Sequence, residues 1–382
     1  MSSKFPSELI VDILSYLPVK SLCRFKCVSK SWSVSITHPR FIKLHQARNR
    51  RQKFLLVNGE SLYHVDPDTS LLHQELSLSY CKVFPNKHDR PFKEEHDHRN
   101  FRDCRWVSES SNGLFCVSGS SNGLFCTQMI DPPDLDFFVY NPSTRESKKI
   151  PNIDSEKESY HDWMRYPLHG FGYAESIDDY KFVKFFAKRK IIQIFSLRNN
   201  SWKTIKCDYP FNVNIVHPIF EFSLYGAVLN GSLHYGIPLN GAIHWMVVVV
   251  DYDDRRYYSM VAFDLVEEKF KTLPLHYQFS FKVKRVTVLR DRLCFIDWHN
   301  RFWIMEEYGV KESLTRVSIP KKPYPYKCTW KNIGYLFLNL DDDGWLQRDY
   351  DSTVFDGIRS YTMHTYVENL VSLNFHRRPR DK

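Results

Sequence analysis

Beyond residue 51 the sequence is a succession of short, mostly apolar runs separated by turn residues, and this pattern constrains the fold more than any other feature. Such runs lie at 54–57, 137–140, 182–186, 191–195, 260–263, 293–296 and 335–338. Asn58-Gly59 follows the first run and Asn141-Pro142 follows the second. Amphipathic stretches of helical length are nearly absent, and aromatic residues, which favour strands, make up 15% of the chain. The pattern predicts an all-β domain built as a sandwich, a barrel or a propeller.

A loose internal repeat favours the propeller. In each copy an apolar strand leads into a polar turn, and a shorter strand follows that ends near a proline or an apolar pair. The copies begin near residues 138, 193, 261 and 302. Their spacing is irregular, at about 40 to 70 residues. We therefore expect a kelch-like β-propeller of about six blades, with a large β-sandwich as the alternative.

The first 45 residues have a different pattern, which is helical. Pro6 suits the first position of a helix, because its missing N–H would be unpaired there anyway. Glu8 lies in the first turn, where the helix dipole favours a negative charge, and Pro18 ends the helix. Between them, apolar residues at helical spacing form one stripe: Leu9, Ile10, Ile13, Leu14 and Leu17.

Further short helices are expected before and after Pro39. A third helix runs from about Val28, which aligns Val28, Trp32 and Ile36 at i, i+4 and i+8. It must end before Pro39, since the residue before a proline is pushed out of helical geometry. Residues 41–44 suggest one further turn. A unit this small cannot bury all of its apolar surface by itself. Either it packs on the rest of the chain, or part of the stripe binds another protein.

The residues of this N-terminal region resemble an F-box. The resemblance rests on the two prolines Pro6 and Pro18, on the Val-x-Lys-x-Trp unit at 28–32 and on the closing Pro39-x-Phe41, with Phe5 where leucine is usual. It implies binding to a Skp-family adaptor, which links to cullin and RING subunits. The residues that would bind the adaptor, none of them catalytic, are Pro6, Leu9, Ile10, Ile13, Leu14, Leu17, Pro18, Leu22, Val28 and Trp32.

The later segments resemble the F-box-associated domain of plant F-box proteins, a family that includes the S-locus F-box-like group. The characteristic pieces are 119–124, 141–146, 170–173, 195–202 and 366–373. The resemblance implies an F-box domain at 1–46 and a propeller-like target-binding domain at 47–382. It also implies a function: the substrate-recognition subunit of an SCF-type cullin-RING ubiquitin ligase, whose protein target is ubiquitinated and degraded.

Two tandem repeats, each with a ten-residue offset, contain Asn-Gly pairs. Residues 110–116 recur unchanged at 120–126, and 229–234 recur nearly unchanged at 239–244. Because both residues of Asn-Gly tolerate positive φ, we predict tight hairpin turns there. Lengthened hairpins explain the repeats more simply than a dedicated ligand site.

The search for catalytic and cofactor motifs is negative. The chain has no G-x-G-x-x-G, G-x-x-x-x-G-K-[ST], H-E-x-x-H or G-x-S-x-G sequence, and its nine cysteines form no C-x-x-C pair. We expect no cofactor, no metal and no enzymatic activity. Without an apolar run of transmembrane length or a signal-peptide pattern, we expect a soluble protein of the cytoplasm and/or nucleus. The formal charge of +9 is spread along the chain, which makes nucleic-acid binding unlikely.

Polar loops are the best candidates for target recognition, because binding residues concentrate on loops held by a rigid scaffold. Three segments stand out, at 87–99, 154–163 and 251–257. Their Arg, His and aromatic residues suit a protein interface: Arg90, His96, Arg99, Tyr160, Trp163, Arg255 and Tyr257. The alternative function is a propeller enzyme or a nucleic-acid-binding protein whose N-terminal helices merely pack within the chain.

Overall fold

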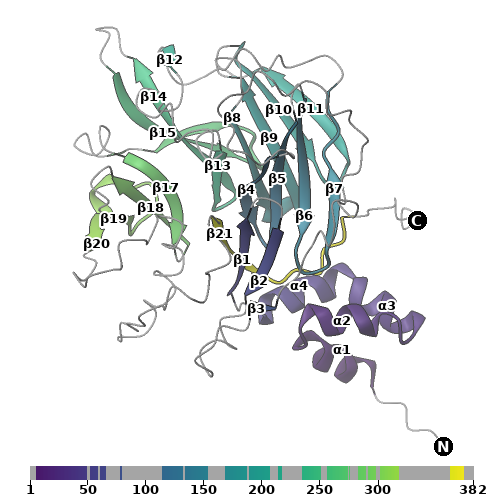
Figure 1. The fold of residues 1–382 in the computed structure, drawn as a ribbon. Helices are drawn as coiled ribbons and strands as arrows, with labels where there is room; N and C mark the ends of the chain where they lie inside the picture. Colours follow the sequence, from purple (N-terminus) through teal and green to yellow (C-terminus); the bar gives the residue numbers. More distant parts are fainter. Residues whose placement is uncertain are drawn as a thin grey trace, which may run out of the picture.

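The computed structural model describes sixteen segments of the chain, which together hold four α-helices, two short 3₁₀ helices and twenty-one strands (Figure 1). They are residues 6–49, 52–58, 61–65, 78–79, 114–131, 134–153, 168–186, 189–206, 214–216, 235–250, 256–273, 275, 283–289, 291–297, 302–317 and 362–373. In these segments, none of the helices has the length and apolar character that crossing a membrane requires.

The helices are α1 (Ser7–Ser15), α2 (Val19–Phe25), α3 (Lys30–Thr37) and α4 (Pro39–Arg48). The prediction of a third helix from Val28 was wrong at its start. Ser29 caps α3 by accepting a hydrogen bond from the Trp32 N–H at 3.1 Å, which leaves Val28 outside the helix and exposed. The expected single turn at 41–44 is a full helix, because Pro39 occupies its first position, where a missing N–H costs nothing.

The strands form five antiparallel groups of four, which we call blades A to E. Blade A is β1 (Gln52–Asn58), β2 (Ser61–Val65), β3 (Leu78–Ser79) and β21 (Thr362–Val367). Blade B is β4 (Leu114–Ser121), β5 (Leu124–Asp131), β6 (Asp134–Asn141) and β7 (Glu146–Lys149). Blade C is β8 (Leu168–Ala174), β9 (Asp179–Phe186), β10 (Ile191–Ser196) and β11 (Ser201–Lys206). Blade D is β13 (Tyr235–Leu239), β14 (Ala242–Val250), β15 (Arg256–Asp264) and β16 (Phe270–Leu273), with β12 (Asn214–Val216) paired to β14. Blade E is β17 (Val283–Leu289), β18 (Arg292–Asp297), β19 (Phe302–Met305) and β20 (Leu314–Val317).

This succession of four-stranded blades confirms the propeller-like prediction and disfavours the sandwich. Blade A is closed by the two ends of the β-domain, since β21 pairs with β1 from Gln52↔Val367 to Val57↔Thr362. Blades C and D join through a short parallel pairing of β8 with β13, at His169↔Tyr235 and Gly170↔Gly236. The number of six blades stays a prediction, because 318–361 lies outside the described residues.

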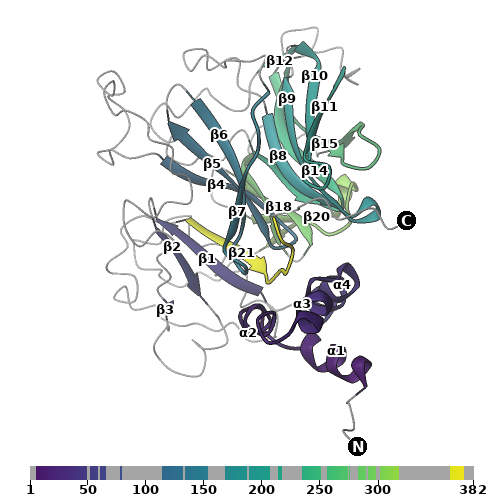
Figure 2. The same cartoon turned by 90° about the vertical axis from the view of Figure 1, so that its right-hand side faces the viewer.

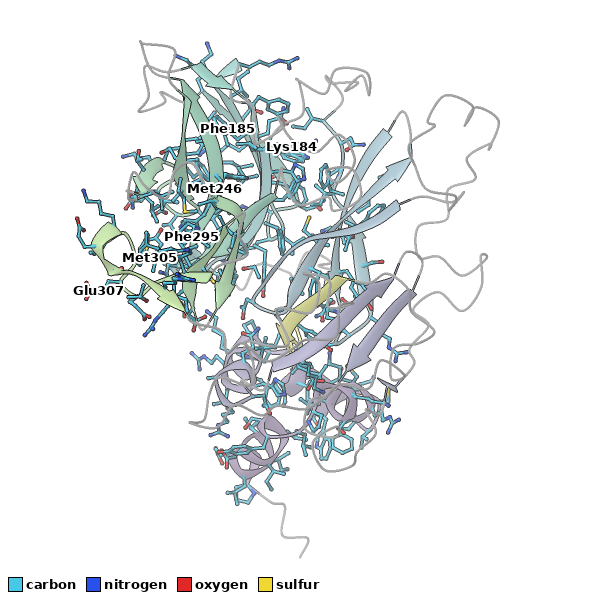
Figure 3. The ribbon with its side chains drawn as sticks, turned by 60° about the vertical axis from the view of Figure 1, so that its left-hand side comes forward. Lys184, Phe185, Met246, Phe295, Met305 and Glu307 are labelled. Carbon is cyan, nitrogen blue, oxygen red and sulfur yellow. The ribbon has the colours of Figure 1, made fainter. Side chains whose placement is uncertain are left out.

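Apolar clusters fill the spaces between neighbouring blades. Phe137 and Val139 of blade B pack with Phe171, Phe182 and Phe195 of blade C. Blades C and D share a second cluster that centres on Phe185 and Trp245, and blades D and E share a third that contains Phe295 and Met305. Figure 3 shows Met246 of blade D near these last two side chains of blade E. Lys184 and Phe185 are successive residues of β9, so their side chains lie on opposite faces of blade C.

The predicted Asn-Gly hairpin turns are confirmed for the second copy of each repeat. Asn122 and Gly123, between β4 and β5, have φ of 46° and 81°. Asn240 and Gly241, between β13 and β14, have φ of 50° and 70°. Both pairs have the positive φ of a two-residue type I′ turn, whose twist matches that of the strands it joins. The first copies, at 112–113 and 230–231, lie outside the described residues.

Alternate turns of each blade lie at the same end of the propeller, because successive strands are antiparallel. The end that carries Asn122, Asn141 and Asp178 contacts the C-terminal segment and α4, so it faces the helices. Figures 1 and 2 both show the four helices gathered at this end of the β-domain. We call it the helix-facing end, and the other the opposite end.

Two glycines allow the close approach of blades C and D. A Cβ added to Gly236 would lie 2.1 Å from Ile243 Cγ2 and 2.6 Å from Trp245 Cε2. Trp245 cannot easily give way, because it is buried and its Nε1 donates a 3.0 Å hydrogen bond to the His169 carbonyl. Gly172 is the comparison, since its added Cβ would be close only to the terminal methyl Cδ1 of Leu265, at 2.7 Å, with its other neighbours at 3.4 Å or more.

We predict that Gly236→Ala destabilises the β-domain by roughly 1–3 kcal/mol through overpacking. The measurement is the free energy of opening of blades C and D by native-state hydrogen exchange. Gly172→Ala, the control, should cost clearly less. Equal costs for the two variants would contradict the packing argument.

Candidate functional site

The apolar residues of α1 divide into two faces. Ile10, Leu14 and Leu17, at i, i+4 and i+7, turn toward the other helices. Leu9 and Ile13 turn to the outside, where they are 51% and 62% exposed. One helix stripe therefore serves two purposes: its inner edge builds a core, and its outer edge leaves apolar surface in contact with solvent.

The inner face belongs to a small core that the helices share. Trp32 packs edge-to-face on Phe25, with ring centroids 5.5 Å apart. The core takes one residue from outside the helices, Leu370, which lies far along the chain. Its fully buried members are Leu14, Val19, Leu22, Ile36, Phe41 and Leu370.

The ten predicted adaptor-binding residues therefore lie at three depths. Leu14 and Leu22 are in the core, where they support the surface from beneath. Ile10, Leu17 and Trp32 are half-buried. The exposed five are Pro6, Leu9, Ile13, Pro18 and Val28.

Two further exposed apolar residues were missed by the sequence analysis, Tyr16 and Val34. Tyr16 could have been found, because it follows Leu9 and Ile13 at the i+7 and i+3 positions that share their helix face. Nothing in the local pattern singles out Val34. We call Leu9, Ile13 and Tyr16 the outer face of α1.

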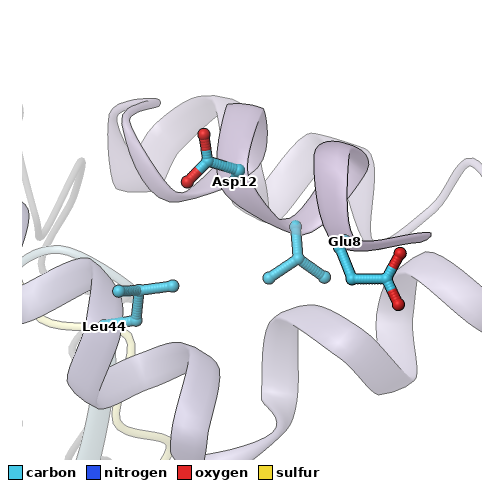
Figure 4. Close-up of a pocket in the computed structure, with 4 residues that line it drawn as sticks. Glu8, Asp12 and Leu44 are labelled. Atoms are coloured by element: carbon cyan, nitrogen blue, oxygen red, sulfur yellow. The ribbon is translucent and has the colours of Figure 1, made fainter. Parts of the chain in front are cut away.

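A shallow pocket of about 270 Å³ lies between α1 and α4. Val11 and Leu44 give it apolar walls, and Glu8 and Asp12 stand at its edge (Figure 4). Asp12 is held by Arg48, whose Nη1 lies 2.6 Å from Asp12 Oδ1. Such a pocket suits an aliphatic side chain with a cationic end, because the stem meets apolar atoms and the head meets carboxylates.

Polar contacts fix α1 against α4. The ring of His45 lies in the core, with Nε2 2.8 Å from the Leu17 carbonyl. Burial lowers the pKa of His45, so the ring is neutral at neutral pH and Nε2–H donates this bond. Asn49 continues the link, since its Nδ2 donates to the carbonyls of Ser15 at 2.7 Å and His45 at 3.0 Å. The outer face of α1 is therefore presented by a rigidly held helix.

The predicted target-binding residues lie almost wholly outside the described residues. This applies to Arg90, His96, Arg99, Tyr160, Trp163 and Arg255. The prediction that Tyr257 lies in a loop was wrong. It lies in β15, because β14 and β15 pair as far as Val250↔Arg256. The segment between these strands is thus shorter than predicted.

Most strand ends that flank the three predicted loops lie at the opposite end of the propeller. β3 is the exception: Ser79 pairs with His64, which pairs with Leu55 near the start of β1, so β3 ends near the helix-facing end. β4 begins at the opposite end, after 80–113, and β7 ends and β8 begins there around 154–167. The same holds for β14 and β15 around 251–255. This follows from strand direction, since the helix-facing ends of these strands carry the other turns.

Among the residues that the structure describes, no three or more His, Cys, Asp or Glu side chains come together as metal ligands would. The charged groups that are buried there serve structure. Lys181 of blade C donates to the Leu265 carbonyl at 2.6 Å and to Glu268 at 3.0 Å, which links blades C and D. His244 of blade D lies 2.6 Å from the Tyr308 hydroxyl of blade E, and burial lowers its pKa to about 4.

Comparison with known proteins places both parts of the chain. Residues 2–44 match the family model of the F-box domain, and 72–313 match that of the F-box associated beta propeller domain. F-box protein CPR1 of Arabidopsis thaliana is 26% identical over 347 residues, which cover 84% of this chain and 74% of that protein. F-box/kelch-repeat protein At3g23880 of Arabidopsis thaliana is 26% identical over 351 residues, which cover 87% and 84% respectively.

Likeness to solved structures is remote. TolB from Acinetobacter baumannii superposes with a TM-score of 0.34 at 10% identity, covering 67% of this chain and 49% of that one. A resemblance this distant adds nothing to the fold assignment.

The two faces of α1 predict different responses to truncation. Leu14→Ala should lower the opening free energy of the helices by about 2–4 kcal/mol, because it leaves a cavity in the core. Leu9→Ala and Ile13→Ala should each change it by less than about 0.5 kcal/mol, since both side chains are largely exposed. Hydrogen exchange in α1–α4 measures all three, and a loss of stability in Leu9→Ala as large as in Leu14→Ala would contradict the division.

Proposed function

Because this chain belongs to the plant F-box proteins that carry an F-box associated β-propeller domain, we propose that it is the substrate-recognition subunit of an SCF-type cullin-RING ubiquitin ligase. Its F-box, 1–46, docks a Skp-family adaptor, and through it cullin and RING subunits. Its propeller domain, 47–382, binds a protein target that is then ubiquitinated and degraded. The protein acts in the cytoplasm and/or nucleus.

The outer face of α1 carries the docking part of the proposal. Leu9, Ile13 and Tyr16 expose apolar surface on a helix whose other face is already used in a core. Exposed apolar surface of this kind marks an interaction site when it is contiguous and held rigidly. Val28, Pro6 and Pro18 add exposed residues from the same N-terminal region. The match to the F-box domain is the reason for proposing a Skp-family adaptor as the partner of this surface.

The arrangement of strand ends supports a separate place for the target. The strands that flank 154–163 and 251–255, and the strand that follows 87–99, have these ends away from the helices, so a target held there leaves the adaptor surface free. The formal charge of +9 would steer an acidic target surface toward the protein, an effect that salt weakens. We therefore assign target recognition to the opposite end of the propeller.

We assign no catalytic step to this chain. F-box proteins are receptor subunits, and the families that it matches are not enzyme families. Ubiquitin transfer would depend on the recruited RING subunit and conjugating enzyme. Membership of the family also disfavours the alternative of a propeller enzyme or nucleic-acid-binding protein.

The docking proposal predicts that Leu9→Ala/Ile13→Ala weakens adaptor binding by about 2–4 kcal/mol, as loss of central apolar contacts does in other interfaces. Calorimetry with the purified adaptor and the full-length chain measures this. Val266→Ala/Val310→Ala is the matched control, since it truncates two exposed apolar residues of the propeller. Unchanged affinity in the α1 variant, with the fold intact by circular dichroism, would refute the docking assignment.

The target proposal predicts that target choice follows the three predicted loops. Segments 87–99, 154–163 and 251–255 would be replaced by those of a related receptor, with the F-box untouched. Proteins captured by the full-length chain, quantified by mass spectrometry, should then change to those of the donor. Replacing 197–200, a turn of the helix-facing end, is the control and should leave the captured set as it was. If the captured proteins stay the same after the loop exchange, the loop assignment is wrong, and the strand surfaces become the candidate target-binding site.

A further inference from the structure

The last described residues of the chain pass between the helices and the propeller. β21 ends at Val367, and 368–373 then runs along the helix-facing end toward β7 (Figures 1 and 2, yellow). We call 368–373 the strap. Residues 368–370 turn alternately to the helices and to the propeller, and 371–373 contact blade B of the propeller.

On the helix side the strap completes the F-box. Leu370 is 1% exposed and belongs to the same core as Leu14, Leu22 and Ile36. Glu368 accepts a hydrogen bond from the Val19 N–H at the start of α2, at 3.4 Å, where the preceding Pro18 provides no side-chain cap. A helical unit of this size has little core of its own, so a buried leucine from elsewhere is a large fraction of it.

On the propeller side Asn369 is the central residue. It is fully buried, and its Nδ2 donates to the Asn122 carbonyl at 2.6 Å and to the Tyr180 hydroxyl at 2.9 Å. Its backbone N–H donates to Ser143 Oγ at 3.1 Å. Gly123 leaves room for this contact, because an added Cβ would lie 2.8 Å from the Cβ of Asn369. One side chain thus links a turn of blade B to strand β9 of blade C.

Asn141 of blade B holds the strap backbone. Its Nδ2 donates to the carbonyls of Asn369 at 3.0 Å and Val371 at 2.8 Å. Its Oδ1 meanwhile accepts from the Ser143 N–H at 2.9 Å, which shapes its own turn. Glu146 accepts from the Leu373 N–H at 2.5 Å, and the Leu373 side chain enters the core between blades B and C.

The other connections that the described segments offer between helices and propeller are weaker. α4 ends at Arg48 and β1 begins at Gln52, so the chain itself limits the distance between them. Lys43 lies 3.6 Å from Asp178, but both side chains are exposed, and ion pairs of that kind contribute little. Lys53 of β1 lies 2.9 Å from Glu368, so this ion pair holds the strap itself.

We propose that the adaptor-docking module is discontinuous, made of 6–49 and the strap, and that the strap fixes the angle between this module and the propeller. Leu370 and Asn141 are then positioning residues: neither meets the adaptor or the target, yet both set where the adaptor surface lies. The link to adaptor binding rests on the proposed function, whereas the strap's role in the fold does not.

The first test compares two leucines of the strap in the full-length chain. Leu370→Ala should speed amide exchange in α1–α4 by about tenfold or more, with blades B and C unchanged. Leu373→Ala should speed amide exchange in blades B and C and leave exchange in α1–α4 unchanged. Adaptor affinity should fall about tenfold in Leu370→Ala alone, although this side chain is buried away from solvent. Exchange in α1–α4 that does not respond to Leu370→Ala would overturn the proposal, even if the wild-type chain binds no adaptor.

The second test concerns the angle. Asn141→Asp keeps the oxygen that its own turn needs and removes the two donors to the strap, with no change in size. Small-angle X-ray scattering should show a broader distribution of interatomic distances, while exchange within α1–α4 stays slow. Asn199→Asp, the same charge change at an exposed turn, is the control and should leave the profile unchanged. An unchanged profile in Asn141→Asp would show that the strap does not set the angle.

Discussion

The structure depends on the burial of one leucine from the far end of the chain in the core of the N-terminal helices. Four short helices over 6–49 cannot enclose an adequate core by themselves. Leu370 fills part of that core, beside Leu14 and Phe41. With the inner face of α1 satisfied in this way, Leu9 and Ile13 remain on the outside and are not drawn inward by collapse. The exposure of the outer face of α1 thus accompanies a core that is completed by a residue from outside the helices.

That contact depends on the closure of blade A. Leu370 reaches the helices only because β21 pairs with β1, the strand that follows α4. This pairing covers the inner edge of β1, which would otherwise be open to another chain. Because Gln52 pairs with Val367, α4, which precedes β1, and the strap, which follows β21, lie at the same end of the blade. Closure of blade A and completion of the F-box are therefore consequences of one strand pairing.

The features that could be predicted from sequence are local ones. Pro18 and Pro39 limit helices through their own geometry, and Asn122-Gly123 forms its turn through φ values that few other pairs adopt. The features that could not be predicted are set by distant partners. The two faces of α1 have equally apolar residues, so packing against the other helices and Leu370 decides which one is inside. Tyr257 resembles its polar neighbours in 251–257, and only its pairing with Val249 places it in a strand. The segment 366–373 was recognised as characteristic of the family, but its role lies in contacts with residues more than two hundred positions away.

The tight turns of the helix-facing end explain why the strap can bind there. Seven of the described turns at this end contain a non-glycine residue at positive φ, among them Asn122, Arg145 and Asp178. Such turns are compact and bring backbone carbonyls and short polar side chains to the surface at fixed positions. Asn122 offers its carbonyl to the strap in this way, and Asn141 holds its own turn while it binds the strap. At the opposite end, the strand ends that the structure describes bind neither the strap nor the helices. The connections at that end can therefore vary in length and sequence without disturbing the F-box, which is the freedom that a family of receptors with different targets requires.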